Sequence, residues 1–357
     1  MEYNNRLLLK GNEALVYGAL RAGCDCFFGY PITPASEIAH SAAALFPKLN
    51  RVFIQAESEI AAINMVIGAV AEGKRAMTAS SGLGISLKQE EVSYLAAYEM
   101  PAVIADITRG GPGLGNIGPE QADYFQLVKG GGHGSYKCLV FTPNSVQEMC
   151  DMAYESFLMA EKYRMPAYIM ADGVIGQMME SLTLPEPAVY DYDPEWKMGR
   201  VVDGKANIIT SIYLEHDDLE ELNRRLQAKY RLIEDTEQRA EEIMTEDAEI
   251  VLVAYGITSR VASGAVTMLR GEGIKAGLIR PKMVFPFPKT SLRRLLDNGV
   301  TRALVSVELS AGQMIEDIKL SIDCKLPVYL CNRMGGNIPT CSDICDMVKK
   351  ILGEMKQ

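Results

Sequence analysis

The sequence of 357 residues contains no Cys-x-x-Cys pair. Its eight cysteines are scattered, with one residue between Cys24 and Cys26 and three between Cys341 and Cys345. Zinc and iron–sulfur sites are usually built from closely spaced sets of cysteines, and this sequence has none. We therefore expect no metal site on this chain, and we interpret the cysteines as the reduced, mostly buried thiols of a cytoplasmic protein.

Two further absences narrow the class of protein. The longest nearly apolar stretch, Ala61–Ala71, is too short to cross a bilayer, and the N-terminal residues lack the apolar core of a signal peptide. Basic residues (36) are fewer than acidic ones (46), and the resulting net charge of -10 repels a phosphate backbone. We therefore expect no membrane and no nucleic acid as partner. The length and the 48% hydrophobic content predict a globular protein of two domains.

Short β-rich apolar runs alternate with helix-period segments through the first half of the chain. We expect strands at residues 24–30, 51–55, 75–79, 101–107, 137–141 and 166–170. Helices are expected near residues 12–21, 35–45, 59–71, 84–98 and 145–162. Apolar strands that alternate with helices of this length are typical of a parallel sheet covered on both faces, which is the doubly wound α/β fold.

The pattern changes after residue 182. Residues 182–206 are rich in Pro, Tyr and Asp, and residues 213–246 are densely charged with a helical apolar period, which predicts a linker followed by a long exposed helix. A second α/β series follows, with strands expected at 250–255, 275–280, 302–307 and 327–330. The sequence thus predicts a first domain over 1–185, a linker over 186–247 and a second parallel-sheet domain over 248–357.

The loops that follow the strands are the candidate sites, because ligands of open parallel sheets bind beyond the carboxyl ends of the strands. After the first expected strand comes Tyr30-Pro31-Ile32-Thr33-Pro34, in which two prolines stiffen the loop and fix the position of Thr33. The same residues fit an ordinary helix start equally well, with Pro34 in the first turn.

A carboxylate follows the second expected strand. Ser58 can cap a helix there, and Glu59 then lies in the first turn, ahead of the almost wholly apolar stretch Ile60–Val70. A negative charge in a first turn is favoured by the helix dipole alone. Glu59 is therefore a candidate whose position has a purely structural explanation as well.

Glycine-containing loops follow the third and fourth expected strands. The loop Ser80-Ser81-Gly82-Leu83-Gly84 offers hydroxyl and N–H groups to a ligand, although it could also be a plain turn. The segment from Thr108 to Gly118 combines Arg109 with five glycines, and a guanidinium is suited to bidentate binding of a carboxylate.

The second of these loops contains a formal Gly-x-Gly-x-x-Gly at Gly113, Gly115 and Gly118, so a nicotinamide dehydrogenase is an alternative. The dinucleotide fingerprint opens the first strand–helix unit, runs directly into a helix and is followed about 20 residues later by an acidic residue. Here the glycines follow the fourth strand, Pro119 interrupts, and residues 138–143 contain no carboxylate. The context therefore disfavours a dinucleotide site.

Taken in order, these four loops closely resemble those of the α subunit of 2-oxoacid:ferredoxin oxidoreductases, and the likeness spans nearly the whole chain. Within that family the chain looks most like the subunit of the branched-chain enzyme that acts on 3-methyl-2-oxobutanoate (2-oxoisovalerate). The 2-oxoglutarate enzyme is the near alternative. The resemblance implies a thiamine-diphosphate pyrimidine-binding fold followed by a transketolase C-terminal-like fold, and an activity of oxidative decarboxylation with coenzyme A.

The resemblance also implies roles for particular residues. Glu59 matches the glutamate that activates the cofactor by sharing a proton with its pyrimidine ring. Thr33 and Arg109 match residues that contact the substrate and take part in catalysis. Tyr30 matches a residue that contacts the substrate. The other loop positions that match residues around the cofactor are Pro31, Ile32, Ser81 and Gly82.

A module for the diphosphate is missing. Thiamine enzymes are expected to hold the diphosphate and Mg²⁺ with a Gly-Asp-Gly segment followed by Asn-Asn, and here Asn4-Asn5 lies at the wrong end of the chain. The resemblance therefore implies a diphosphate-binding β subunit with Mg²⁺, and ferredoxin-like γ subunits with [4Fe-4S] clusters. It further implies a 2-oxoacid, coenzyme A and ferredoxin as substrates, and a dimer of hetero-oligomers as the assembly.

Two points stay open at the level of sequence. A scaffold that kept the fold and lost the chemistry is a further alternative, against which the joint presence of Glu59, Thr33 and Arg109 speaks. His133, in the segment Gly130–Gly134, is as readily a structural or partner-contact residue as a catalytic one.

Overall fold

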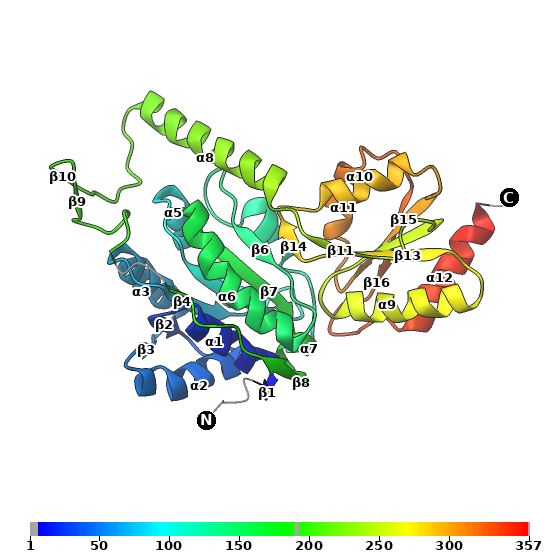
Figure 1. The fold of residues 1–357 in the computed structure, drawn as a ribbon, viewed down its shortest axis with the longest axis horizontal. Coiled ribbons are helices and arrows are strands. Elements are labelled where there is room, and N and C mark those ends of the chain that lie inside the picture. Colours follow the sequence, from blue (N-terminus) through cyan, green and yellow to red (C-terminus); the bar gives the residue numbers. More distant parts are fainter. Residues whose placement is uncertain (1–5, 190–192, 356–357) are drawn as a thin grey trace.

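The computed structural model describes residues 6–189 and 193–355, and Asn4-Asn5 lies outside this part of the chain. Two α/β units lie side by side, and helix α8 (His216–Thr236) crosses the N-terminal unit on its way to the C-terminal one (Figure 1). Among the described residues, no helix is long and apolar enough to cross a membrane.

A seven-stranded sheet forms the N-terminal unit, in the order β14-β6-β7-β5-β4-β2-β3. Its pairs are parallel except for β14 against β6. The strands are β2 (Cys26–Gly29), β3 (Val52–Gln55), β4 (Ala76–Ser80), β5 (Val103–Thr108), β6 (Leu139–Phe141), β7 (Ala167–Asp172) and β14 (Met283–Phe285). The six strands expected from the sequence of this unit are present, and the doubly wound α/β prediction is confirmed.

Helices cover both faces of this sheet. Along β5, Val103, Ala105 and Ile107 pack in one apolar cluster and Ile104 in another, as the two-residue period of a strand requires. The first cluster is completed by α1 (Gly11–Arg21), α2 (Ser36–Leu45) and α6 (Val146–Tyr163). The second is completed by α3 (Glu59–Ala71) and α5 (Gln89–Ala97).

Local differences from the sequence-based prediction occur near the site and at the N-terminus. The single helix expected over 84–98 is two helices, α4 (Leu83–Ser86) and α5, which are separated at Leu87 and Lys88. Strand β1 (Arg6–Lys10), which we did not expect, pairs with β8 (Met179–Thr183) in an antiparallel two-stranded sheet. The short elements are η1 (Pro47–Leu49), the π-helical turn η2 (Gln126–Gly130) and α7 (Gly173–Gln177).

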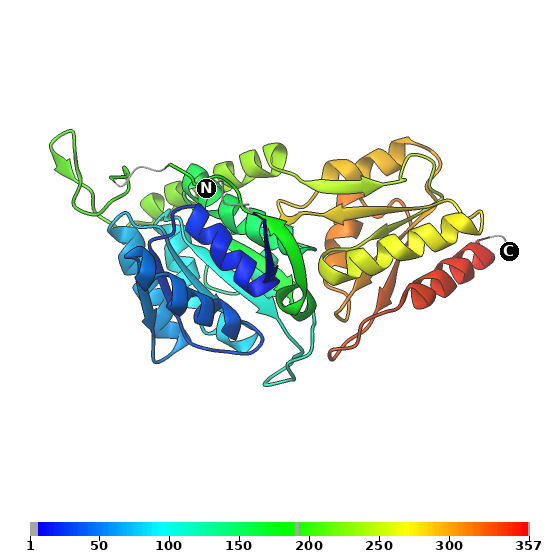
Figure 2. The same ribbon diagram turned by 60° about the horizontal axis from the view of Figure 1, so that its bottom comes forward.

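The C-terminal unit is a five-stranded sheet in the order β11-β13-β12-β15-β16, parallel except for β11. Its strands are β11 (Ala240–Ile243), β12 (Ile250–Val253), β13 (Ala276–Pro281), β15 (Ala303–Glu308) and β16 (Val328–Asn332). Helices α9 (Gly256–Gly271) and α12 (Cys341–Glu354) lie side by side against it, as both views show (Figure 2). Helices α10 (Lys289–Asp297) and α11 (Met314–Ser321) pack together on the other face.

Segments between the two sheets do not form a simple linker. A small hairpin of β9 (Val201–Val202) and β10 (Lys205–Ala206) precedes α8, which ends ten residues before the expected helix end at 246. Residues 240–243 are instead the edge strand β11 of the second sheet. Conversely, β14 comes after β13 in the chain but pairs with β6 of the first sheet. The two units are therefore interlocked by β14, an edge strand that the C-terminal part of the chain contributes to the first sheet.

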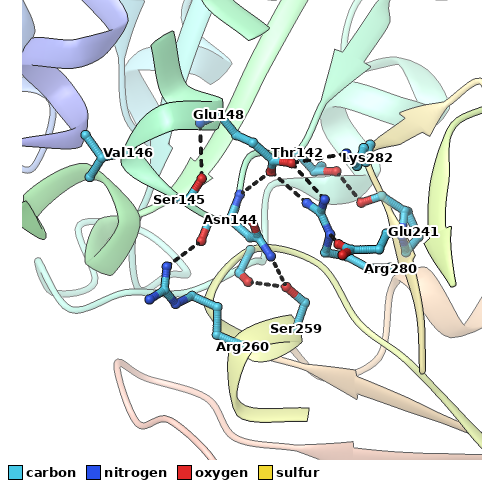
Figure 3. A network of polar contacts seen from close by, with 12 residues as sticks. Thr142, Asn144, Ser145, Val146, Glu148, Glu241, Ser259, Arg260, Arg280 and Lys282 are labelled. Atoms are coloured by element: carbon cyan, nitrogen blue, oxygen red, sulfur yellow. Dashed lines mark hydrogen bonds and ion pairs between the residues drawn. The ribbon is translucent and has the colours of Figure 1, made fainter. Parts of the chain in front are cut away.

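A polar network joins the units where these strands meet (Figure 3). Arg280 of β13 is 2% exposed, and its guanidinium donates two hydrogen bonds to the Glu148 carboxylate and one to Glu241, each of 2.7 Å. Close by, the Asn144 amide donates to the hydroxyl of Ser259 at 3.1 Å. The N-terminus of α6 is thus fixed to strands and helices of the C-terminal unit.

Candidate active site

Glu59 is the first residue of α3, directly after the loop that follows β3. The Ser58 hydroxyl caps the helix by accepting a hydrogen bond from the Ala61 N–H at 3.2 Å. The Glu59 side chain is 7% exposed, and among the described residues no donor hydrogen-bonds to its carboxylate. A nearly buried carboxylate without a protein donor is costly, and it is therefore available to a ligand that brings a proton or an N–H group.

Helix α4 approaches this carboxylate closely. A Cβ atom on Gly84 would lie 2.1 Å from the Ser80 hydroxyl oxygen and 2.8 Å from Oε1 of Glu59. Position 84 therefore needs a glycine, because any side chain would displace one of these two groups. The close approach also places the loop after β4 against Glu59.

The same loop carries further polar groups without partners. The hydroxyls of Ser80 and Ser81 are fully buried and form no hydrogen bond with the described residues. Gly82 adopts a φ of +51°, and a Cβ atom on it would lie 3.6 Å from Cγ and Nε of Arg109. The loop therefore extends from the Glu59 carboxylate to the guanidinium of Arg109.

Arg109 follows β5 and contacts the loop after β2. Its guanidinium donates to the main-chain carbonyl of Thr33 at 2.9 Å and to that of Leu114 at 3.2 Å. Among the described residues, no hydrogen bond joins Tyr30, Pro31 or Ile32 to Glu59 or Arg109. Tyr30 remains 40% exposed, and Ile32 packs against the core below α1 and α2.

A cleft of about 810 Å³ opens beside Arg109, between the two units. Its lining comes from the N-terminal unit, Gly82, Leu83, Ser86, 109–113, Glu120, Ala122 and Asp123, and from the C-terminal unit, Ala311, Gln313, Met334 and Gly335. No sequence pattern singles out the residues that follow the glycine-rich loop. Glu120 accepts hydrogen bonds from the N–H groups of Gly111 at 2.8 Å and Gly335 at 3.2 Å, and so ties that loop to the C-terminal unit.

Two acidic side chains lie together below the cleft. Asp106 of β5 is fully buried beside Asp123 and close to the backbone of Gly82. Burial raises the pKa of Asp106 well above its ordinary value, and the Asp123 carboxyl raises it further. Burial also raises the pKa of Asp123. Two touching carboxyls in such surroundings share a proton.

The glycine-rich loop does not have the geometry of a dinucleotide fingerprint. The Asn116 N–H donates to the Gly110 carbonyl at 3.0 Å, and a Cβ atom on Gly115 would lie 1.7 Å from the same oxygen. The chain thus turns back on itself, and a bridge pairs Arg109 with Pro119. The next helical turn, η2, begins only at Gln126. The loop therefore lacks the strand–turn–helix that a dinucleotide-binding dehydrogenase requires.

His133 lies elsewhere. It borders a separate cavity of about 440 Å³ with residues of α5 and α8, among them Tyr94 and Leu222. Within the described residues, no group of three or more His, Cys, Asp or Glu side chains is arranged to hold a metal ion, and the eight cysteines are free thiols.

The family models show that this chain is a subunit of a 2-oxoacid:ferredoxin oxidoreductase with a thiamine diphosphate-binding domain. Residues 17–244 match the thiamine diphosphate-binding model of pyruvate flavodoxin/ferredoxin oxidoreductases, and residues 248–344 match core domain II of pyruvate:ferredoxin oxidoreductase. The chain belongs to this family. The resemblance drawn from the loops is thereby confirmed.

Two relatives are similar over most of the chain. The ketoisovalerate oxidoreductase subunit VorB of Methanothermobacter marburgensis is 58% identical, over 97% of this chain and 98% of that protein. The 2-oxoglutarate synthase subunit KorA of Archaeoglobus fulgidus is 38% identical, over 89% of this chain and 92% of that protein.

Solved structures agree with the fold. A 2-oxoglutarate:ferredoxin oxidoreductase from Magnetococcus marinus, with 2-oxoglutarate, coenzyme A and succinyl-CoA bound, superposes with a TM-score of 0.85 at 25% identity. The match covers 98% of this chain and 66% of that one. A split-gene transketolase in an inactive β4 tetramer matches with a TM-score of 0.59 at 16% identity and supports the fold alone.

The residues at the site fit a thiamine cofactor. A ligand with an N–H group or a proton would satisfy the Glu59 carboxylate, which is 7% exposed. The close approach at Gly84 keeps the Ser80 hydroxyl beside this carboxylate.

Proposed function

We propose that this chain is one subunit of a cytoplasmic 2-oxoacid:ferredoxin oxidoreductase, and that its N-terminal unit binds the aminopyrimidine of thiamine diphosphate. The supporting observation is the Glu59 carboxylate, which is nearly buried at the start of α3 and has no protein donor among the described residues. Thr33 and Arg109 are joined to it through the loop at residues 80–84.

We assign to Glu59 the exchange of a proton with the pyrimidine ring of the cofactor. When bound, thiamine diphosphate supplies the carbon nucleophile that attacks a 2-oxoacid carbonyl and lets carbon dioxide leave. Glu59 holds or donates one proton at its carboxyl, and the capped first turn of α3 fixes the position of its backbone. Pro31, Ile32, Ser81 and Gly82 are assigned to the wall of the cofactor pocket.

Arg109 and Thr33 are assigned to the substrate. Two N–H groups of Arg109 are held by the carbonyls of Thr33 and Leu114, which fixes the plane of the guanidinium and leaves further N–H groups for the 2-oxoacid carboxylate. Such orientation lowers the barrier by holding the reacting carbonyl in place. The Thr33 hydroxyl is assigned to the same binding of the substrate. Tyr30, which is exposed on the same loop, is assigned to contact the substrate side chain.

The proposed substrate is 3-methyl-2-oxobutanoate, the ketoisovalerate in the name of the relatives that share 55–58% of this sequence. The 2-oxoglutarate subunits share 35–38%. A 2-oxoglutarate molecule carries a second carboxylate, whereas the described lining of the cleft holds a single cation, Arg109, beside the acidic Glu120 and Asp123. A monocarboxylate with an apolar side chain suits this balance of charge better.

The remaining parts of the reaction are assigned to partner subunits. A β subunit holds the diphosphate and Mg²⁺, and ferredoxin-like γ subunits carry [4Fe-4S] clusters toward ferredoxin, with coenzyme A as acyl acceptor. We further propose a dimer of such hetero-oligomers. In this chain, residues 1–185 act as the pyrimidine-binding domain and 248–357 as the transketolase C-terminal-like domain, with 186–247 between them.

The function is tested by reconstitution. This chain is purified alone and co-expressed with its neighbouring subunits, and anaerobic reduction of viologen is measured with coenzyme A and a panel of 2-oxoacids. We expect turnover only in the complex, highest with 3-methyl-2-oxobutanoate. Highest turnover with 2-oxoglutarate would overturn the substrate. Nicotinamide-dependent activity of the isolated chain, or no turnover in any complex, would overturn the function.

The role of Glu59 is tested by Glu59→Gln, with Glu57→Gln as the control. Both variants remove one negative charge from the same loop, but Glu57 is exposed and precedes the helix. We expect the complex to assemble in both cases, and turnover to fall by about 100-fold or more in Glu59→Gln alone. Turnover retained in that variant would refute the assignment.

A further inference from the structure

Lys88 is a lysine without any exposed surface, located between α4 and α5. Its ammonium group donates a hydrogen bond of 3.1 Å to the main-chain carbonyl of Glu59. It therefore ties the junction of two helices to the first residue of α3. Lysine is almost never fully buried in proteins unless its charge is compensated, so this position calls for a physical reason.

Two carboxylates supply the compensation. Burial lowers the pKa of Lys88 to about 8, while the charges of Glu59 and Glu91 oppose that shift. Glu91 of α5 is itself buried; one oxygen accepts from the Asn64 amide at 3.0 Å, and the other has no partner among the described residues. Three ionisable groups from α3, α5 and the α4–α5 junction thus meet below the proposed cofactor pocket.

An apolar residue would fill this space at lower cost if packing were the only requirement. Replacing buried ionic groups with apolar ones of similar volume is often neutral or stabilising. The ammonium group does two things that a methionine cannot do. It fixes the start of α3 through the Glu59 carbonyl, and its positive charge interacts with the Glu59 carboxyl group.

We propose that Lys88 is a positioning residue for Glu59: it orients the first turn of α3 and places a buried positive charge beside the carboxyl group that shares a proton with the cofactor ring. This inference rests on the proposed role of Glu59. Deprotonation of Lys88 at alkaline pH removes this positive charge and lowers turnover, without any change in the groups that bind the 2-oxoacid.

The test uses the reconstituted complex with Lys88→Met, Lys88→Arg and, as matched control, Lys137→Met. Lys137 is a second lysine whose pKa is lowered by burial, and its ammonium donates to the Val128 carbonyl at 3.2 Å and lies 5.7 Å from the centre of the Phe285 ring. It is therefore a similar lysine outside the site. The pH dependence of kcat and KM is measured for each complex.

In the wild-type complex we expect kcat to fall as pH rises through about 8. Lys88→Met is expected to lower kcat at least about ten-fold and to abolish this alkaline limb, with the KM for the 2-oxoacid unchanged. Lys88→Arg is expected to retain activity, with the limb moved to higher pH, because a guanidinium keeps its charge there. Lys137→Met should behave as the wild type does.

A second readout does not depend on turnover. The aminopyrimidine and iminopyrimidine forms of bound thiamine diphosphate differ in near-ultraviolet circular dichroism, so the spectrum reports where the proton resides. We expect Lys88→Met to show at neutral pH the spectrum that the wild type shows only at alkaline pH. This measurement remains decisive if Lys88→Arg fails to fold.

Either of two results would overturn the inference. In one, Lys88→Met keeps the kcat, the alkaline limb and the spectrum of the wild type. In the other, it loses activity while the limb and the spectrum stay in place, which is the behaviour of a residue that only supports the fold. Failure of the proposed role of Glu59 is recognised separately, because Glu59→Gln would then retain turnover whatever the Lys88 variants do; failure of the proposed function is recognised by the absence of turnover in the wild-type complex.

Discussion

The guanidinium of Arg109 donates a hydrogen bond of 2.9 Å to the main-chain carbonyl of Thr33. These residues are 76 positions apart and follow the strands β5 and β2, between which β4 lies in the sheet. The contact joins two of the loops at the carboxyl ends of the strands. It also sets the orientation of the group that we assign to the substrate carboxylate.

The first prediction concerns this guanidinium. Arg109→Lys keeps the positive charge but loses the planar guanidinium. An ammonium group cannot donate hydrogen bonds to the Thr33 and Leu114 carbonyls and, in the same plane, to a substrate carboxylate. Loss of about 1.5 to 3 kcal/mol from a charged hydrogen-bonded pair corresponds to a KM for the 2-oxoacid that is about 10 to 100 times higher. This KM is measured by steady-state kinetics of the reconstituted complex. Arg224→Lys on the exposed face of α8 is the control, and an unchanged KM in Arg109→Lys would refute the assignment.

The second prediction concerns the close approach of α4 to Glu59. Gly84→Ala adds a methyl group 2.1 Å from the Ser80 hydroxyl and 2.8 Å from Oε1 of Glu59, so one of these groups must move. A displacement of about 1 Å at a reacting group can cost about 100-fold in rate. We expect kcat to fall by about 10 to 100-fold, because alanine is tolerated in helices and the fold should persist.

Gly68→Ala is the control for this change. It lies on α3, the same helix as Glu59, and no atom lies within 4 Å of the added Cβ. It should keep full activity and be slightly more stable to heat. Equal activity of the two alanine variants would show that the carboxylate does not need its present position.

Much of this architecture follows from local sequence patterns. In β5 alternate residues face opposite apolar clusters, and the stretch is apolar enough to indicate a strand covered on both faces. Since loops after parallel strands gather at one edge, the meeting of Thr33, Gly82 and Arg109 could be expected as well. Glu59 was a candidate from its position after β3.

Other features depend on contacts between distant residues. The three residues of β14 pair with β6 more than 140 positions earlier, and no local period predicts such a pairing. Asp123 meets Asp106 because the glycine-rich loop turns back, with the Thr108 hydroxyl bonded to the Glu120 carbonyl. Lys88 sits in a helix-period segment, where a lysine normally indicates a solvent-exposed face.

The third prediction concerns the carboxyl pair below the cleft. The pKa of Asp106 is raised in the folded chain, so the unfolded chain releases this proton first as pH rises above 3.8. Stability that the pair contributes at low pH is therefore lost as pH rises toward the folded pKa. Asp106→Asn does not titrate. We expect its melting temperature to increase relative to that of the wild type as pH rises from acidic to neutral.

Scanning calorimetry at several pH values measures this difference. Asp247→Asn serves as a control of opposite sign, because a hydrogen bond from Arg270 lowers the pKa of Asp247 on the surface. That variant should lose stability relative to the wild type as pH rises toward 3.8 from more acidic values, and the difference should then stay nearly constant up to neutral pH. A melting-temperature difference for Asp106→Asn that does not change with pH would mean that the two carboxyls do not share a proton.

The last prediction concerns the junction of the two units. Glu148→Gln leaves the buried Arg280 guanidinium with one remaining carboxylate, Glu241, which is itself half exposed. Removing one partner of a buried ion pair costs about 3 to 5 kcal/mol, because the other charge stays buried. We expect a clear fall in the urea midpoint of the isolated chain. Arg224→Met is the control, since Arg224 and Glu220 form an exposed pair on α8 whose loss costs about 0.5 kcal/mol or less. Equal midpoints for Glu148→Gln and Arg224→Met would mean that the edge strand β14 holds the units together without this network.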